Sequence, residues 1–256
     1  MKRKLLFIAV LAAGTVFGSY AAKPGVIAHR GYWDVPTSAQ NSIRSLIKAD
    51  SIKAFGSEFD VWYTADKKLV VNHDDAINGI VIETAKAADV LAQKLPNGEN
   101  VPTLEAYLDK AKQLNTKLIF ELKPHKDLPH EREAVKEVIK LVNKKGLNNR
   151  VEYITFSLSA LVAFIQNAPK GTEVYYLNGD LTPRQLMQLG AAGPDYHMNV
   201  FRKNPTWIKE CHDLGMKVNV WTVNKKADME YFIGEGVDYI TTNDPELLES
   251  LISAQN

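Results

Sequence analysis

The chain has 256 residues, of which 45% are hydrophobic and 24% charged, the composition of an ordinary folded domain. Its length suits one large α/β domain such as a (β/α)8 barrel, which typically needs about 250 residues. Without the first 21 residues, which hold three basic and no acidic side chains, 28 basic and 30 acidic side chains remain, a formal net charge of −2. This balance argues against a nucleic-acid partner.

The N-terminal segment is typical of a secretory signal peptide. Basic residues at positions 2–4 precede an apolar run over 5–17, and small residues follow at Ser19 and Ala21. This order predicts cleavage after Ala21, a single mature domain over 22–256 with no stable membrane insertion, and a periplasmic or secreted location. A permanent membrane anchor is the alternative, although the apolar run is short for a spanning helix. The one cysteine, Cys211, excludes an internal disulfide.

Short runs rich in β-branched and aromatic residues alternate with helical patterns along the rest of the chain. Such alternation predicts parallel strands with covering helices. The expected strands are 26–28, 57–63, 69–73, 118–123, 151–156, 173–177, 196–200, 218–222 and 239–241.

Several helix boundaries are marked by capping residues. At Thr182-Pro183, Asn204-Pro205 and Asp244-Pro245, a capping side chain precedes proline at the first helical position. Thr103 is expected to cap a helix over 104–113. A further helix is expected over 131–145, with Gly146 in the left-handed conformation after it.

Nine expected strands are one too many for an eight-stranded barrel. Runs 57–63 and 69–73 are separated by only five residues, 64–68. A connection that short cannot make a parallel crossover, so the two runs must form an antiparallel hairpin. Folding the chain back brings His73 roughly opposite Phe59 or Asp60.

Three acidic side chains are expected inside the barrel. Glu58 and Asp60 share one face of their strand, and Glu121 shares a face with Lys123 on the strand 118–123. Parallel sheets are covered on both sides, and buried carboxylates are strongly disfavoured unless positive charge compensates them. Three carboxylates suit one hard divalent cation, Mg²⁺ or Ca²⁺. An internal salt-bridge network with Arg30 and Lys123 is the alternative.

Two histidines accompany this acidic cluster. A single histidine near a strand end is more often structural than catalytic, but His29 and His73 each end a strand next to the carboxylates. Imidazole titrates near neutral pH, so one ring could act as a base and the other as an acid. Four further histidines lack such neighbours and are expected to be structural or at the surface: His125, His130, His197 and His212.

Arg30 and Lys123 indicate an anionic substrate, because arginine can grip a phosphate with two hydrogen bonds and lysine offers a point charge. Arg30 could instead pair with Asp34 or Glu58. Trp221 should point into the barrel. Its default role there is packing in the core, and the alternative is that it forms one wall of a site for a small organic group.

Taken together, the motifs resemble the glycerophosphodiester phosphodiesterase family, in family order from residue 25 to the C-terminus. The matching segments are Ala28-His29-Arg30-Gly31, Glu58-Phe59-Asp60-Val61, Val70-Val71-Asn72-His73-Asp74, Val101-Pro102-Thr103-Leu104-Glu105, Glu121-Leu122-Lys123, Trp221-Thr222-Val223-Asn224 and Thr242-Asn243-Asp244-Pro245. One departure is Gln40, which stands where the family usually has glutamate.

The resemblance implies a (β/α)8 barrel with a short hairpin insertion after the second strand, which hydrolyses glycerophosphodiesters to sn-glycerol 3-phosphate and an alcohol. It implies the following roles: His29 and His73 as acid and base, Glu58, Asp60 and Glu121 as ligands of one Mg²⁺ or Ca²⁺, and Arg30, Lys123 and Trp221 as substrate-binding residues. Two other activities stay open: a phospholipase-type phosphodiesterase acting on lyso- or phosphoinositide lipids, and a secreted phosphodiester binder without catalysis.

Overall fold

Eight parallel strands form the centre of the molecule in the computed structural model, which describes residues 23–254. The predicted signal segment 1–21 lies outside these residues. The parallel strands are β1 (Gly25–Ala28), β2 (Gly56–Tyr63), β6 (Lys117–Leu122), β7 (Val151–Thr155), β8 (Val174–Tyr176), β9 (Gly193–His197), β10 (Asn219–Trp221) and β11 (Tyr239–Thr242). Neighbours pair in chain order, and β1 pairs with both β11 and β2, so the sheet closes. The predicted (β/α)8 barrel is confirmed.

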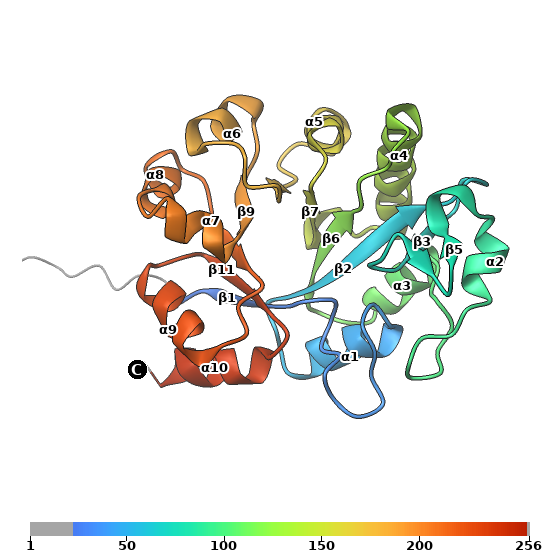
Figure 1. Cartoon of the computed structure of the whole chain (residues 1–256), viewed down its shortest axis with the longest axis horizontal. Coiled ribbons are helices and arrows are strands. Elements are labelled where there is room, and N and C mark those ends of the chain that lie inside the picture. Colours follow the sequence, from blue (N-terminus) through green and yellow to red (C-terminus); the bar gives the residue numbers. More distant parts are fainter. Residues whose placement is uncertain (1–22, 255–256) are drawn as a thin grey trace, which may run out of the picture.

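Helices surround the strands (Figure 1). They are α1 (Ile43–Ser51), α3 (Leu104–Ala111), α4 (Leu128–Lys145), α5 (Leu158–Asn167), α6 (Pro183–Leu189), α7 (Met198–Lys203), α8 (Trp207–Asp213), α9 (Lys226–Gly234) and α10 (Pro245–Ser253), with a 3₁₀ turn, η2 (Asn148–Arg150). Side chains on the outer face of the strands pack against them: Phe59 stacks on Tyr107 of α3 with ring centroids 4.4 Å apart. Within residues 23–254, none of the helices combines the length and the hydropathy needed to cross a bilayer.

The predicted hairpin is present, and beyond Ser57 its second strand replaces β1 as the neighbour of β2. β1 pairs with β2 only as far as Ser57, and β3 (Leu69–Val71) takes over the same edge of β2 in antiparallel register, with Val71 opposite Val61. The Asn72 N–H then donates to the Asp60 carbonyl at 3.0 Å. His73 therefore emerges beside the acidic residues of β2, as the length of the turn predicts.

An insertion lobe, residues 72–100, follows the hairpin and stands at the right of Figure 1. It contains β4 (Ala76–Ile77), β5 (Ile80–Val81), the 3₁₀ turn η1 (Ile82–Thr84) and α2 (Ala87–Leu91). Its small apolar core packs on Trp62 and Val70 of the hairpin. The lobe is thereby fixed next to the end of β2.

The strand expected over 196–200 is wrong. β9 instead covers Gly193–His197, and Met198 begins α7. Tyr196, Met198 and Val200 alternate as in a strand, but the His197 ring accepts the Asn199 N–H at 3.2 Å and so caps a helix. The first residue of β9 is Gly193, and it must be glycine because a Cβ at this position would overlap the Lys217 carbonyl.

The helix start expected at Asn204-Pro205 is also wrong. The Asn204 N–H donates to the carbonyls of Val200 and Phe201, so this residue ends α7, and the next helix begins at Trp207. The caps at Thr182 and Asp244 are confirmed, and each accepts a backbone N–H of the following first turn.

The two other expected helices are confirmed with shifted ends. Thr103 caps α3, which ends at Ala111. Helix α4 begins at Leu128, behind an Asp127 cap, and Gly146 follows it with a φ of 71°.

Candidate active site

Three buried carboxylates meet at the carboxyl-terminal end of the barrel. Glu58, Asp60 and Glu121 each offer an oxygen within 4.8 Å of the others, and they are 3%, 1% and 6% exposed. The register of β2 and β6 places Asp60 beside Glu121. Strand alternation turns these side chains inward, while Phe59 and Phe120 pack in the outer core.

Of the three carboxylates, Asp60 has the most positively charged neighbours. Lys123 Nζ lies 3.2 Å from Asp60 Oδ1 and 2.8 Å from Glu121 Oε1, while Arg30 Nε lies 3.9 Å from Asp60 Oδ2. Asn41 donates to the same Asp60 oxygen at 2.8 Å. Burial alone would raise the pKa of Asp60, but the positive charge of Lys123 and its other partners hold this pKa below its usual value. Part of the expected salt-bridge network is therefore present.

The other two carboxylates remain under-compensated. Burial, and then the charge of Asp60, raise the pKa of Glu58 well above its usual value and that of Glu121 to about 8. Glu58 Oε2 accepts the Arg30 N–H at 2.7 Å, but Glu58 Oε1 is buried and has no hydrogen-bond partner within the described chain. An orphaned buried oxygen in a cluster with excess negative charge is what a hard divalent cation would relieve, so these residues fit such an ion.

The two histidines present their rings with one nitrogen fixed. His29 Nδ1–H donates to Asn243 Oδ1 and His73 Nδ1–H donates to Asp74 Oδ1, both at 2.7 Å. In the neutral ring, Nε2 is then left without a proton. Burial, assisted by Arg30, lowers the pKa of His29 to about 4, and burial also lowers that of His73. Both rings are therefore largely neutral at pH 7.

A tight turn aims Arg30. This residue has a φ of 58°, and Gly31 follows with a φ of 76°, where a Cβ would overlap the Ser45 side chain. Arg30 Nη1 donates to Gln40 Oε1 at 2.6 Å, so the glutamine orients the guanidinium. The Arg30 side chain forms its ion pair with Asp60. The alternative expectation, an ion pair with Asp34 or Glu58, is wrong.

Apart from Asp60, the site residues predicted from the sequence line an inner cavity of about 100 Å³. One side is polar, formed by both histidines, Arg30 and Lys123, and the other is mostly apolar, formed by Ile154, Phe156, Leu177 and Trp221. Trp221 Nε1 donates to the Asp195 carbonyl at 2.8 Å, which fixes the indole as a wall.

Asp195 is a cavity residue that the sequence reasoning missed. Its side chain lines the inner cavity and is 2% exposed, and within residues 23–254 its Oδ1 has no hydrogen-bond partner. Burial raises the pKa of this carboxyl to about 7, although the Asn219 amide opposes the shift. The inward alternation of β9 was the available signal, but the strand was expected to begin at residue 196, three residues after its observed start at Gly193.

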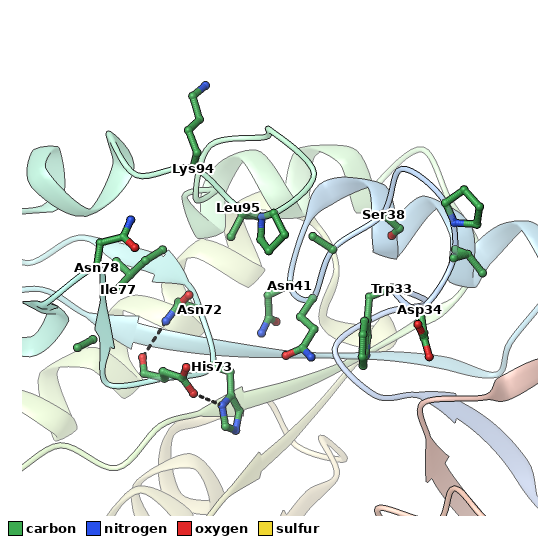
Figure 2. Close-up of a pocket in the computed structure, with 17 residues that line it drawn as sticks. Trp33, Asp34, Ser38, Asn41, Asn72, His73, Ile77, Asn78, Lys94 and Leu95 are labelled. Carbon is green, nitrogen blue, oxygen red and sulfur yellow. Dashed lines mark hydrogen bonds and ion pairs between the residues drawn. The ribbon is translucent and has the colours of Figure 1, made fainter.

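A second, outer hollow of about 930 Å³ adjoins the inner cavity, and His73 lines both. It lies between the loop after β1 and the insertion lobe. Figure 2 shows His73 at its base, Trp33 and Asp34 on one side, and Asn78 and Ile77 of the lobe on the other.

The four histidines expected to be structural stay outside the linings of both cavities. His125 is buried, and its Nε2 accepts the Tyr63 N–H at 3.0 Å. His212 pairs with Asp238 at 2.9 Å, and His130 contacts the Tyr63 carbonyl at 3.2 Å.

Comparisons with known proteins agree with this geometry. The Glycerophosphoryl diester phosphodiesterase family model matches residues 29–247. A crystal structure of a glycerophosphodiester phosphodiesterase from Parabacteroides distasonis is 47% identical, with a TM-score of 0.90 over 91% of this chain and 98% of that one. A curated relative from Caldanaerobacter subterraneus subsp. tengcongensis, named glycerophosphodiester phosphodiesterase, is 31% identical over 89% of this chain and 97% of its own length.

A phosphodiesterase of Oleispira antarctica, solved in complex with the product sn-glycerol-3-phosphate, is 23% identical and has the same fold, with a TM-score of 0.77 over 91% of this chain and 98% of that one. The family match covers most of the chain, including every motif of the inner cavity. The protein therefore belongs to the glycerophosphoryl diester phosphodiesterase family.

Proposed function

We propose that the protein hydrolyses glycerophosphodiesters to sn-glycerol 3-phosphate and an alcohol. Family membership supports the reaction class. The observation that carries the proposal is a cluster of three carboxylates, two of which line one small cavity together with two cationic side chains and two imidazoles. Glu58, Asp60 and Glu121 would hold one divalent cation, Mg²⁺ or Ca²⁺, for which oxygen ligands are suited.

The bound cation would supply positive charge that neutralises the phosphate. Arg30 and Lys123 would bind the phosphoryl oxygens from the polar side of the cavity. Arg30 lines the cavity, and its Nε–H, 3.9 Å from Asp60 Oδ2, donates no hydrogen bond to another described residue. Lys123 brings an ammonium held by Asp60 and Glu121.

His29 would act as the general base and His73 as the general acid. His29 lines the inner cavity and not the outer hollow, and its unprotonated Nε2 would take the proton of the attacking hydroxyl. Attack by water gives sn-glycerol 3-phosphate directly, whereas attack by a glycerol hydroxyl gives a cyclic phosphate that a water molecule then opens. As the new P–O bond forms, the ester bond to the alcohol breaks. The departing oxygen would take the Nε2 proton of the imidazolium form of His73, a minor form at pH 7 that the ring, 35% exposed, reaches by taking a proton from solvent. Asp74 supports this role because its carboxylate stabilises the charged ring of His73.

The direct test is turnover of glycerophosphocholine with and without a chelator. We expect release of sn-glycerol 3-phosphate in Mg²⁺ or Ca²⁺, its loss in EDTA and its return when the cation is restored. Undiminished turnover in EDTA would show that the cation assignment is wrong. Binding without product would indicate a phosphodiester binder, and faster turnover of lysophosphatidylcholine would indicate a lipid phosphodiesterase.

Asp195 is proposed to accept a hydrogen bond from a glycerol hydroxyl bound in the inner cavity. The similar-sized replacement Asp195→Leu should lower kcat/KM for glycerophosphocholine by about tenfold, the scale of a lost hydrogen bond to a buried charged group. Turnover of bis(4-nitrophenyl) phosphate, which has no glycerol, should remain nearly unchanged. Equal losses on both substrates would instead assign Asp195 a structural role.

A further inference from the structure

The inner cavity and the outer hollow share His73, and a phosphodiester has two ester groups to place in them. A diester carries two groups on phosphorus, and the inner cavity, at about 100 Å³, is too small to hold both. His73 lines both this cavity and the outer hollow of about 930 Å³. Figure 2 shows His73 at the base of the outer hollow, so a diester whose glycerophosphoryl group lies in the inner cavity would place its second ester group beyond His73.

The charges lining the outer hollow are mainly negative. Asp34 and Asp74 are both exposed, and the Asp74 side chain is 78% exposed. Apart from His73, Lys94 is the basic residue among the described lining, but its ammonium is bonded to Asn100 and extends away from the hollow in Figure 2. The carboxylate of Asp34 has no such cationic neighbour among the other lining residues.

The amide groups add hydrogen-bond acceptors to this lining. Asn72 Nδ2 donates a hydrogen bond to the Asp74 carbonyl at 2.8 Å, and Asn78 Nδ2 donates one to Gln93 Oε1 at 2.9 Å. Each amide oxygen therefore remains as an acceptor for a ligand, beside the second N–H of the same amide. Trp33 adds an indole wall beside Asp34, a surface suited to an ammonium group (Figure 2).

We propose that the outer hollow binds the departing alcohol and favours one that carries an ammonium group over a neutral alcohol. This proposal rests on the hydrolysis proposed above, since it names the second ester group of the same substrate. Asp34 attracts the ammonium through solvent, so its contribution is modest and screened by salt.

The test compares glycerophosphoethanolamine with glycerophosphoglycerol, whose second alcohol is neutral. The wild-type protein should have the higher kcat/KM for the ethanolamine diester, and Asp34→Asn should reduce the ratio of the two by about two- to fivefold. Asp75→Asn is the matched control, because Asp75 is an exposed neighbouring aspartate that lies outside the lining. High salt should reduce the wild-type ratio in the same direction.

Dissociation constants measured by calorimetry on a His29→Ala background give the same comparison without turnover, since His29 lies outside the outer hollow. An Asp34→Asn ratio equal to that of wild type, or equal losses on both diesters, would overturn the proposal. If no diester is hydrolysed but the binding ratio depends on Asp34, the proposed hydrolysis fails while the head-group site stands.

Discussion

Replacing His29 or His73 by alanine is expected to lower kcat for glycerophosphocholine at least about a hundredfold, the usual scale for loss of a general acid or base. Each ring has Nδ1 engaged by a partner, so Nε2 is the atom that can exchange a proton with the substrate. Steady-state rates in saturating Mg²⁺ or Ca²⁺ would measure the effect. The control is His212→Ala, since His212 lies outside both cavities.

The acid and base roles of the two histidines can be distinguished with substrates whose leaving groups differ in their need for a proton. 4-Nitrophenolate departs without the help of an acid, so His73→Ala should lose far less activity on bis(4-nitrophenyl) phosphate than on glycerophosphocholine. His29→Ala should be impaired on both substrates, because both need a base for the nucleophile. Full activity of both alanine variants on glycerophosphocholine would exclude proton transfer by these rings, and the reverse pattern of losses would exchange their roles.

The acidic trio could be predicted because its positions depend on local rules. Alternation along a strand puts Glu58 and Asp60 on one face, and the five-residue turn forces His73 back beside them. The partners of these residues depend instead on contacts between distant segments. Asn243, which orients His29, is 214 residues away in the chain, and no spacing rule connects the two.

The outer hollow could not be predicted for a related reason. Its walls are the loop after β1 and the insertion lobe, and the lobe is placed by packing on Trp62 and Val70. Sequence also left open how Gln40 affects Arg30. A neutral amide oxygen accepts the guanidinium N–H, so the arginine is oriented without another buried negative charge.

The fold was predicted where capping and alternation agree, and misread where they conflict. Thr182 and Asp244 precede proline and cap helices as expected. Over 193–205 the apolar alternation continues past the true end of β9, and the helix that replaces the expected strand is capped by His197, an uncommon capping residue. That displacement also hid Asp195, because a strand beginning at 196 leaves it outside the barrel.

Removing the divalent cation is expected to make the protein less stable as the pH rises from about 6.5 to 8. The pKa of Glu121 in the folded protein is raised to about 8 by burial and then by Asp60, and that of Glu58 is raised for the same reasons. Over this range the folded state binds more protons than the unfolded chain, so the free energy of unfolding falls with pH. Each carboxyl that stays protonated contributes about 1.4 kcal/mol per pH unit.

Other buried groups do not reverse this sign. The histidines with lowered pKa values, His29, His73 and His125, favour the folded state as the pH rises, but this effect fades above about pH 6.5, as the half-protonated unfolded rings lose their remaining protons. The raised pKa of Asp195, about 7, adds to the decline in stability. Asp60, with its lowered pKa, acts only at acidic pH.

A bound cation stabilises the ionised carboxylates, so it should flatten or reverse the decline. Urea unfolding at pH 6.5, 7.25 and 8, in EDTA and in Mg²⁺ or Ca²⁺, measures both slopes. Glu121→Gln is the matched variant: it removes one titrating carboxyl without emptying its space, and it should be less sensitive to pH than the wild-type protein in EDTA. Identical slopes with and without chelator, in a protein shown to retain activity only with the cation, would place the ion away from this trio. The carboxylates would then be held by Lys123 and Arg30 alone.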